Sequence, residues 1–193
     1  DPRSAWEGME AIEVRARALP ELGNHARLDA LVRLEADLLL PVDAMTRVAA
    51  ALQSQESARA LARRLKLSNE ERERLVAALG DDAKIVSYMS LKEMRRAIYK
   101  LGNEAFRDRV MLAWAGAGGE KAQAWRALIA HAQMWTPPKL PLSGDEVMAA
   151  GVPAGPKVGE VMREVEAWWL DADFPDDKLS VIERLKAVAQ GMA

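Results

Sequence analysis

The sequence contains no cysteine among its 193 residues. That absence excludes disulfide bonds and metal sites built on thiolates, and it is typical of a protein from the reducing cytoplasm. Aromatic residues make up only 5% of the chain, no hydrophobic run reaches the length of a transmembrane helix, and the N-terminal residues have no signal-peptide pattern. We therefore expect a soluble, cytoplasmic protein with no membrane partner.

The sequence also lacks the residue arrangements that carry common catalytic chemistry. His25 and His131 are isolated from paired carboxylates, so we interpret them as surface or cap residues rather than metal ligands. Asp171 and Asp173 have the spacing of a metal-binding carboxylate pair, but they lack the strand and glycine turn that nucleotidyl transfer uses. No arrangement typical of serine, thiol or zinc chemistry is present. The sequence predicts no catalytic residues and no metal site.

Helix-forming residues dominate what remains. Ala, Leu, Arg and Glu are abundant, β-branched residues are few, and no segment alternates between apolar and polar residues as a strand would. We predict an all-α fold, an irregular array of helical hairpins with a small C-terminal helical tail. The proline-rich stretch TPPKLP begins at Thr136, and it divides the chain into a helical body, residues 1–135, and a tail, residues 136–193.

Local signals predict several helices individually. Ser68 and Ser90 each begin an S-x-x-E capping box, which is typical of a helix N-terminus. Residues 4–19 are predicted to form one helix, and Asn103 is expected to cap another. Met134 is assigned to the core of a later helix.

The charges are unevenly distributed, although the net charge is only −2. Residues 84–109 contain seven basic side chains and three acidic ones. A helix that begins after Ser90 would place Lys92, Arg96 and Lys100 on neighbouring turns. This row can bind a phosphate backbone or can be a solvated helix face, and the sequence leaves both interpretations open.

The tail contains the most distinctive local pattern. Ser143 is predicted to cap a short helix that ends at Gly151, where a left-handed conformation is expected. Gly155 and Pro156 then begin a long helix, with Pro156 at the first helical position. Gly159 lies one turn further on. This helix start can bind an anion, aided by Lys157, or the glycines and prolines can simply separate two helices.

Residues 151–159, GVPAGPKVG, resemble the C-terminal tail of bacterial CCA-adding tRNA nucleotidyltransferases of the poly(A) polymerase family. The family pattern is approximately G-hydrophobic-P-P-G-P-x-hydrophobic-G, and Ala154 replaces its second proline. LSGD at 142–145, EAWWL at 166–170 and DFP at 173–175 extend the similarity. In the body, LPEL at 19–22 and RLKLSN at 64–69 also resemble the family.

The resemblance implies an all-helical tRNA-binding body and tail that position tRNA, by its elbow and backbone, for 3′-end nucleotide addition. The head and neck domains of the parent chain would supply catalysis, with Mg and CTP or ATP as its cofactor and substrates, and this part would need no cofactor. The head would also decide whether CCA, part of CCA or poly(A) is added. The candidate RNA-binding residues are Lys92, Arg96 and Lys100 in the body, and Lys139, Gly155, Lys157, Gly159 and Arg163 in the tail.

Two functions of other classes remain open from the residues alone. A helical protein-interaction scaffold would expose an apolar groove in place of a basic surface. A DNA-binding module would use residues 58–75 as a helix-turn-helix, although the second helix would begin with Asn69, Glu70 and Glu71, and those carboxylates would face phosphate.

Overall fold

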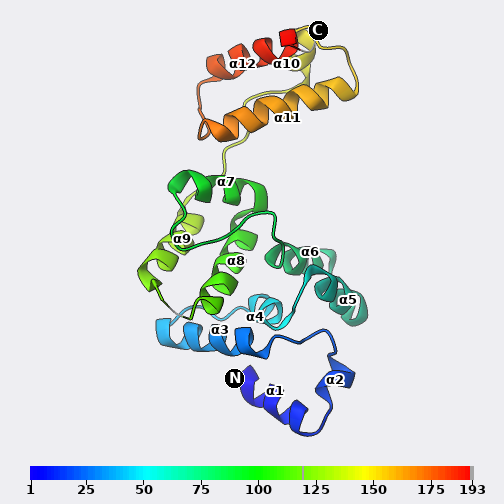
Figure 1. Ribbon diagram of the computed structural model, residues 1–193. Coiled ribbons are helices and arrows are strands. Elements are labelled where there is room, and N and C mark those ends of the chain that lie inside the picture. Colours follow the sequence, from blue (N-terminus) through cyan, green and yellow to red (C-terminus); the bar gives the residue numbers. More distant parts are fainter. Residues whose placement is uncertain (119, 192–193) are drawn as a thin grey trace. The chain divides into compact units, whose positions relative to one another are not determined.

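The computed structural model describes residues 1–118 and 120–191. The chain divides into two compact units, Asp1–Thr136 and Pro137–Ala193, which we call the body unit and the tail unit. Every regular element in the described part is a helix (Figure 1), and this confirms the predicted all-α fold. None of these helices is both long and apolar enough to cross a membrane.

The body unit is organised around one central helix, α8. Nine residues of α8 are buried, on all sides of the helix, because α3, α4, α6, α7 and α9 pack around it (Figure 1). The helices of the body unit are α1 (Pro2–Ala11), α2 (Arg15–Ala18), α3 (His25–Leu38), α4 (Ala44–Ala51), α5 (Gln55–Leu65), α6 (Asn69–Ala78), α7 (Leu91–Leu101), α8 (Asn103–Gly116) and α9 (Ala122–Met134).

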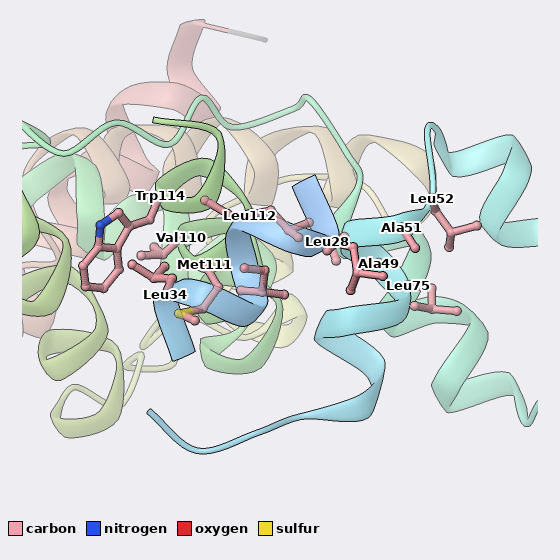
Figure 2. Packing of buried hydrophobic residues seen from close by; sticks show 14 of the residues in the cluster. Leu28, Leu34, Ala49, Ala51, Leu52, Leu75, Val110, Met111, Leu112 and Trp114 are labelled. Carbon is pink, nitrogen blue, oxygen red and sulfur yellow. The ribbon is translucent and has the colours of Figure 1, made fainter. Parts of the chain in front are cut away.

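The body core is formed by apolar side chains from these helices. Leu28 and Leu34 of α3 lie near Val110 and Met111 of α8, and Leu75 of α6 extends the cluster toward α4 (Figure 2). Trp114 of α8 is fully buried and stacks on Trp125 of α9, with ring centroids 6.5 Å apart. Aromatic stacking adds to the free energy gained by burying so much apolar surface.

A charged cluster is also buried in the body unit. Arg74 of α6 forms a two-point ion pair with Asp108 of α8, with Nε–Oδ2 and Nη2–Oδ1 distances of 2.7 and 3.1 Å. Asp108 is only 1% exposed, and it also accepts a hydrogen bond from Thr46 of α4 at 2.8 Å. Arg74 contacts Asp43 at 2.8 Å and Glu104 at 3.0 Å as well. These directional contacts fix α4, α6 and α8 relative to one another.

The tail unit consists of α10 (Gly144–Ala149), α11 (Pro156–Asp171) and α12 (Lys178–Gly191). Both α10 and α12 pack on α11. Val161, Val165 and Trp169 lie on one face of α11 and are buried, whereas Val158, Met162 and Trp168 are half-buried. Trp169 donates a hydrogen bond from Nε1 to the carbonyl of Pro175 at 2.8 Å, and this bond holds the turn before α12.

Three local predictions are wrong. Residues 4–19 form two helices, because Glu13 takes a positive φ of 55° between α1 and α2. Asn103 is not a cap. It lies at the first position of α8, and its amide donates to the carbonyls of Ala132 and Trp135. Met134 is 86% exposed because α9 ends there, beyond the core.

Candidate nucleic-acid interface

The predicted capping box at Ser90 determines where α7 begins. Ser90 Oγ accepts the backbone N–H of Glu93 at 3.3 Å, and Glu93 Oε2 accepts the backbone N–H of Ser90 at 2.7 Å. The hydrogen bonds that the backbone N–H and the hydroxyl of Ser90 donate to the Glu93 carboxylate lower the pKa of Glu93. The buried residues Ala97 and Ile98 turn toward the core. The helix therefore has one fixed rotation about its axis, and its basic residues face away from the core.

The structure places the predicted basic row on this outward face of α7. Lys92 and Lys100 are exposed and Arg96 is half-buried. The spacing of four residues puts the three side chains on successive turns of the same face. Their contact with RNA stays a prediction.

Two other basic residues of the same stretch are structural. Arg107 pairs with Asp43 at 3.1 Å. Arg109 is 5% exposed, donates to Asp82 Oδ1 at 2.6 Å, and also donates to the carbonyl of Ala77. The positive charge that faces solvent is therefore smaller than the residue count of the stretch suggests.

Beside the basic row lies a hollow of about 340 Å³, between α7 and the segment 82–89. Arg96 and Lys100 line it from α7, and Lys84 and Tyr88 line it from the other side. Tyr88 is 75% exposed. Sequence reasoning missed Tyr88, although an aromatic residue between basic ones was a visible signal.

The predicted start of α11 has the expected backbone. Gly155 takes a φ of +127° at the N-cap, a conformation that disfavours residues with a Cβ, and Pro156 is the first helical residue. Gly151 has a φ of +96°, as predicted for the end of α10. The first turn of α11 carries no carboxylate. Pro156 has no N–H and the Val158 N–H donates to the carbonyl of Gly155 at 3.1 Å, so fewer backbone donors are free here than at an ordinary helix start.

The tail candidates are all accessible. Gly155, Lys157, Gly159 and Arg163 are exposed on α11 or at its start. A Cβ added at Gly159 would have no neighbour within 4 Å, so this glycine is not required for packing inside the chain. Lys139 is exposed too, but it lies in the extended segment before α10, separate in sequence from the other four.

Within residues 1–118 and 120–191, no group of three His, Cys, Asp or Glu side chains is placed to hold a metal ion. Asp171 ends α11, and Asp173 follows in a left-handed conformation with a φ of 61°. The chemistry of each unit suits binding: the body unit presents cations and an exposed aromatic ring, and the tail unit presents a helix start next to Lys157.

The fold and these surfaces define an all-helical protein with accessible basic helix faces. The sequence model of the family described as putative tRNA nucleotidyltransferase domain 2 matches residues 42–185. Because this match covers more than half of the chain, the protein belongs to that family, and the family resemblance found from the tail motif is confirmed.

A curated relative comes from Rhodospirillum rubrum, where it is described as an uncharacterized 28 kDa protein in the petA 5′ region. It is 39% identical to this chain over 77 residues. The alignment covers 36% of this chain and 30% of the relative, so less than a third of that protein's length is spanned.

Proposed function

We propose that this chain is the tRNA-binding C-terminal part of a CCA-adding tRNA nucleotidyltransferase. It positions the tRNA while the head domain of the parent chain adds nucleotides to the 3′ end. The observation that carries the proposal is the family match over residues 42–185, whose description is of a second domain of such an enzyme. The basic row on α7, in which Lys92 and Lys100 are exposed and Arg96 is half-buried, gives that domain a surface of the right charge.

The geometry supports recognition by shape and backbone. Folded RNA presents phosphates and 2′-hydroxyls, and its bases are largely hidden in stacked helices. Lys92, Arg96 and Lys100 form a row of cations along one helix face, which suits successive phosphates. The start of α11 adds the positive end of a helix dipole next to Lys157, which suits a single phosphate. The tRNA elbow is the part of the substrate that these contacts would hold.

Nucleotide addition itself belongs to the head and neck in this proposal. There Mg²⁺ would neutralise the triphosphate of CTP or ATP and stabilise the leaving group. The present chain would bind neither nucleotide substrate nor metal, and it would act in the cytoplasm, where tRNA is processed. Incubated alone with Mg²⁺, CTP, ATP and a tRNA that lacks its 3′ CCA, it should incorporate no nucleotide. Metal-dependent incorporation by the purified chain would contradict this assignment.

The central test is a titration of the chain with fluorescently labelled tRNA and with duplex DNA of similar charge, at several salt concentrations. We expect tighter binding to tRNA, with an affinity that falls as salt rises because cations contact phosphates. Equal affinity for both nucleic acids would favour a DNA-binding module. Binding to neither would favour a protein-interaction scaffold.

The hairpin of α5 and α6 argues against the DNA-binding alternative. Glu70 and Glu71 occupy the first turn of α6, where a recognition helix would approach DNA. Glu71 is held there because it accepts the backbone N–H of Ser68 at 2.8 Å. On α5, Arg64 is paired with Glu21 at 2.6 Å. The face that would meet the duplex therefore carries ionised carboxylates.

A further inference from the structure

The hollow beside α7 combines three features that a nucleotide requires. Its floor is apolar, formed by Val86, Met89 and Ala97. Its rim carries cations, and Tyr88 presents an aromatic ring. Its volume of about 340 Å³ lies at the lower end of the range of about 300–1,000 Å³ seen for small-molecule sites. A site of this size suits one planar base with its sugar.

The ring of Tyr88 is open to a ligand. Three quarters of the side chain is exposed, although burial would be favourable for so large an apolar group. The Nζ atom of Lys121 lies 5.9 Å from the ring centroid, so the ring already attracts one cation. Most of the remaining ring surface faces solvent and is available for stacking.

The charges of the hollow favour an anion. Lys84, Arg96 and Lys100 line it, together with the carboxylates of Asp82 and Glu93. Asp82 is neutralised by Arg109, whose hydrogen bond lowers the pKa of Asp82. Glu93 accepts hydrogen bonds from the Ser90 N–H and Oγ, and it keeps its negative charge. The three cations that line the hollow still outnumber its two carboxylates, one of which is paired with Arg109.

We infer that this hollow binds one unpaired nucleotide of RNA, with the base stacked on Tyr88 and the phosphate held by Lys84 and Lys100. The inference rests on the proposed RNA-binding function and specifies part of it. A base within a duplex has both faces covered by its neighbours, so only an unstacked base can reach Tyr88. An acidic peptide would satisfy the cations but would supply no planar group for the ring.

The test uses the whole chain and a fluorescein-labelled single-stranded RNA of about twelve nucleotides, with the same strand paired in a duplex as reference. Tyr88→Ala should weaken binding to the single strand by about tenfold and leave duplex binding unchanged. Tyr88→Phe keeps the stacking surface and should bind like the wild type. Lys84→Ala should flatten the salt dependence of single-strand binding by about 0.7 in slope, for one lost phosphate contact.

Arg59→Ala is the matched control, because Arg59 is an exposed cation on α5 away from the hollow, and it should change nothing. Thermal unfolding followed by circular dichroism should be the same for all variants, since Tyr88 contributes little buried surface. The inference is overturned if Tyr88→Ala binds single strands like the wild type, or if it weakens duplex binding equally.

Substituting 5-iodouridine in the same single strand gives a direct readout, because irradiation crosslinks this base to an aromatic ring stacked on it. Mass spectrometry should find the crosslink on Tyr88, and a crosslink elsewhere overturns the inference. The two proposals fail separately. If tRNA binds and its affinity depends on Lys157, but Tyr88 has no effect, only the nucleotide site is wrong. If the chain binds no tRNA, the proposed function is wrong.

Discussion

The body unit and the tail unit are stabilised in different ways. Buried polar or charged side chains occur in the body unit, where Glu35, Thr46, Asp108 and Arg109 are each at most 5% exposed. Over residues 137–191, the buried side chains are all apolar, with Trp169 the largest of them. Two ion pairs of the tail unit, Glu146 with Lys178 and Glu164 with Arg184, lie at the surface.

This difference shows how charge can specify a helical array. Apolar packing is not directional, so several arrangements of many helices can bury similar area. The body unit contains nine helices in its described part, and the cluster of Arg74 and Asp108 accepts only one arrangement of α4, α6 and α8. The three helices of the tail unit can pack in fewer alternative arrangements, so the shapes of the side chains around Trp169 are enough to specify one of them.

The candidate RNA contacts also differ between the two units in the kind of group that would meet a phosphate. The body row would use side-chain cations along the length of α7, whereas the proposed tail site would use a helix start together with Lys157. Side-chain cations that contact phosphates contribute to the salt dependence of RNA affinity in proportion to their number. The five predictions below test these contrasts, from the largest expected effect to the smallest.

The largest effect is expected from Trp169→Ala in the tail unit. Trp169 is 1% exposed, so its removal leaves a cavity and should cost about 3–5 kcal/mol of tail stability. Hydrogen exchange measured by mass spectrometry should show lost protection over α10–α12 and unchanged protection in α8. Trp168→Ala is the control, because Trp168 is only half-buried. Equal losses in the two variants would contradict the packing described here.

Asp108→Ala should destabilise the body unit by about 3 kcal/mol, because it leaves Arg74 without its main partner in a site where Arg74 is 15% exposed. Urea denaturation and hydrogen exchange over α4, α6 and α8 would measure the loss. The double variant Arg74→Met with Asp108→Leu removes both charges and should be more stable than Asp108→Ala. If the double variant is less stable than Asp108→Ala, the interactions of the charged cluster themselves stabilise the fold, and the loss in Asp108→Ala is not only the cost of an unpaired charge.

Replacing Lys92, Arg96 and Lys100 together by glutamine should flatten the slope of log affinity for tRNA against log salt by about 2–3, if all three contact phosphates. Fluorescence anisotropy at several salt concentrations measures the slope. The matched control replaces Arg59, Arg63 and Lys66, which are exposed cations on α5 or at its end. An unchanged slope in the first variant would make the α7 row a solvated face.

In the tail unit, Lys157→Ala should weaken tRNA binding by about fivefold, since the backbone donors remain. Gly159→Val should weaken it more, because a branched side chain would stand where the RNA backbone approaches. It should leave folding intact, since a Cβ at this position meets no neighbour within 4 Å. Lys186→Ala on α12 is the exposed-cation control. Full tRNA affinity in Gly159→Val would exclude a phosphate at this helix start.

The smallest effect concerns acid stability. Burial would raise the pKa of Asp43, but Arg74, the Thr46 N–H and Arg107 outweigh burial and lower the pKa to about 2. Because the folded-state pKa is the lower one, the contribution of Asp43 is fully present above about pH 4 and is lost as the pH falls toward 2. Asp43→Asn keeps the N-cap and should lower the free energy of unfolding by about 1 kcal/mol, allowing for solvent screening.

Urea midpoints of the wild type and Asp43→Asn should therefore differ at pH 6 and converge near pH 2. In the tail unit, the hydrogen bond from Lys178 is the main cause that lowers the pKa of Glu146 to about 2. Hydrogen exchange in α10 measures the corresponding effect of Glu146→Gln. The protection of the variant and of the wild type should differ at pH 6 and converge near pH 2. A difference that grows toward low pH would contradict both assignments.

Local sequence signals predicted most helix positions, because capping and turn chemistry act over a few residues. The capping boxes at Ser68, Ser90 and Ser143 begin helices as predicted. Gly155 and Pro156 begin α11 as predicted. The break at Glu13 was not predicted, since residues 9–19 contain neither glycine nor proline to mark it.

The candidate site was predicted only where it follows helical spacing. Lys92, Arg96 and Lys100 could be grouped by their separation of four residues, and the structure places them on one outward face. Tyr88 lies outside that helix, and no spacing rule connects it to Lys100. Nor could the sequence show that Arg107 and Arg109 are engaged in ion pairs with Asp43 and Asp82.

The sequence by itself determined the all-α class, the capped helix starts and the family, because each depends on residues close together in the chain. Tertiary structure decided which charges are buried and which are free. Arg74 meets Asp108 across 34 positions and Asp43 across 31, while Tyr88 meets Lys100 only when the segment 82–89 folds against α7. Such pairings depend on packing of the whole body unit, since no local free-energy preference brings these side chains together.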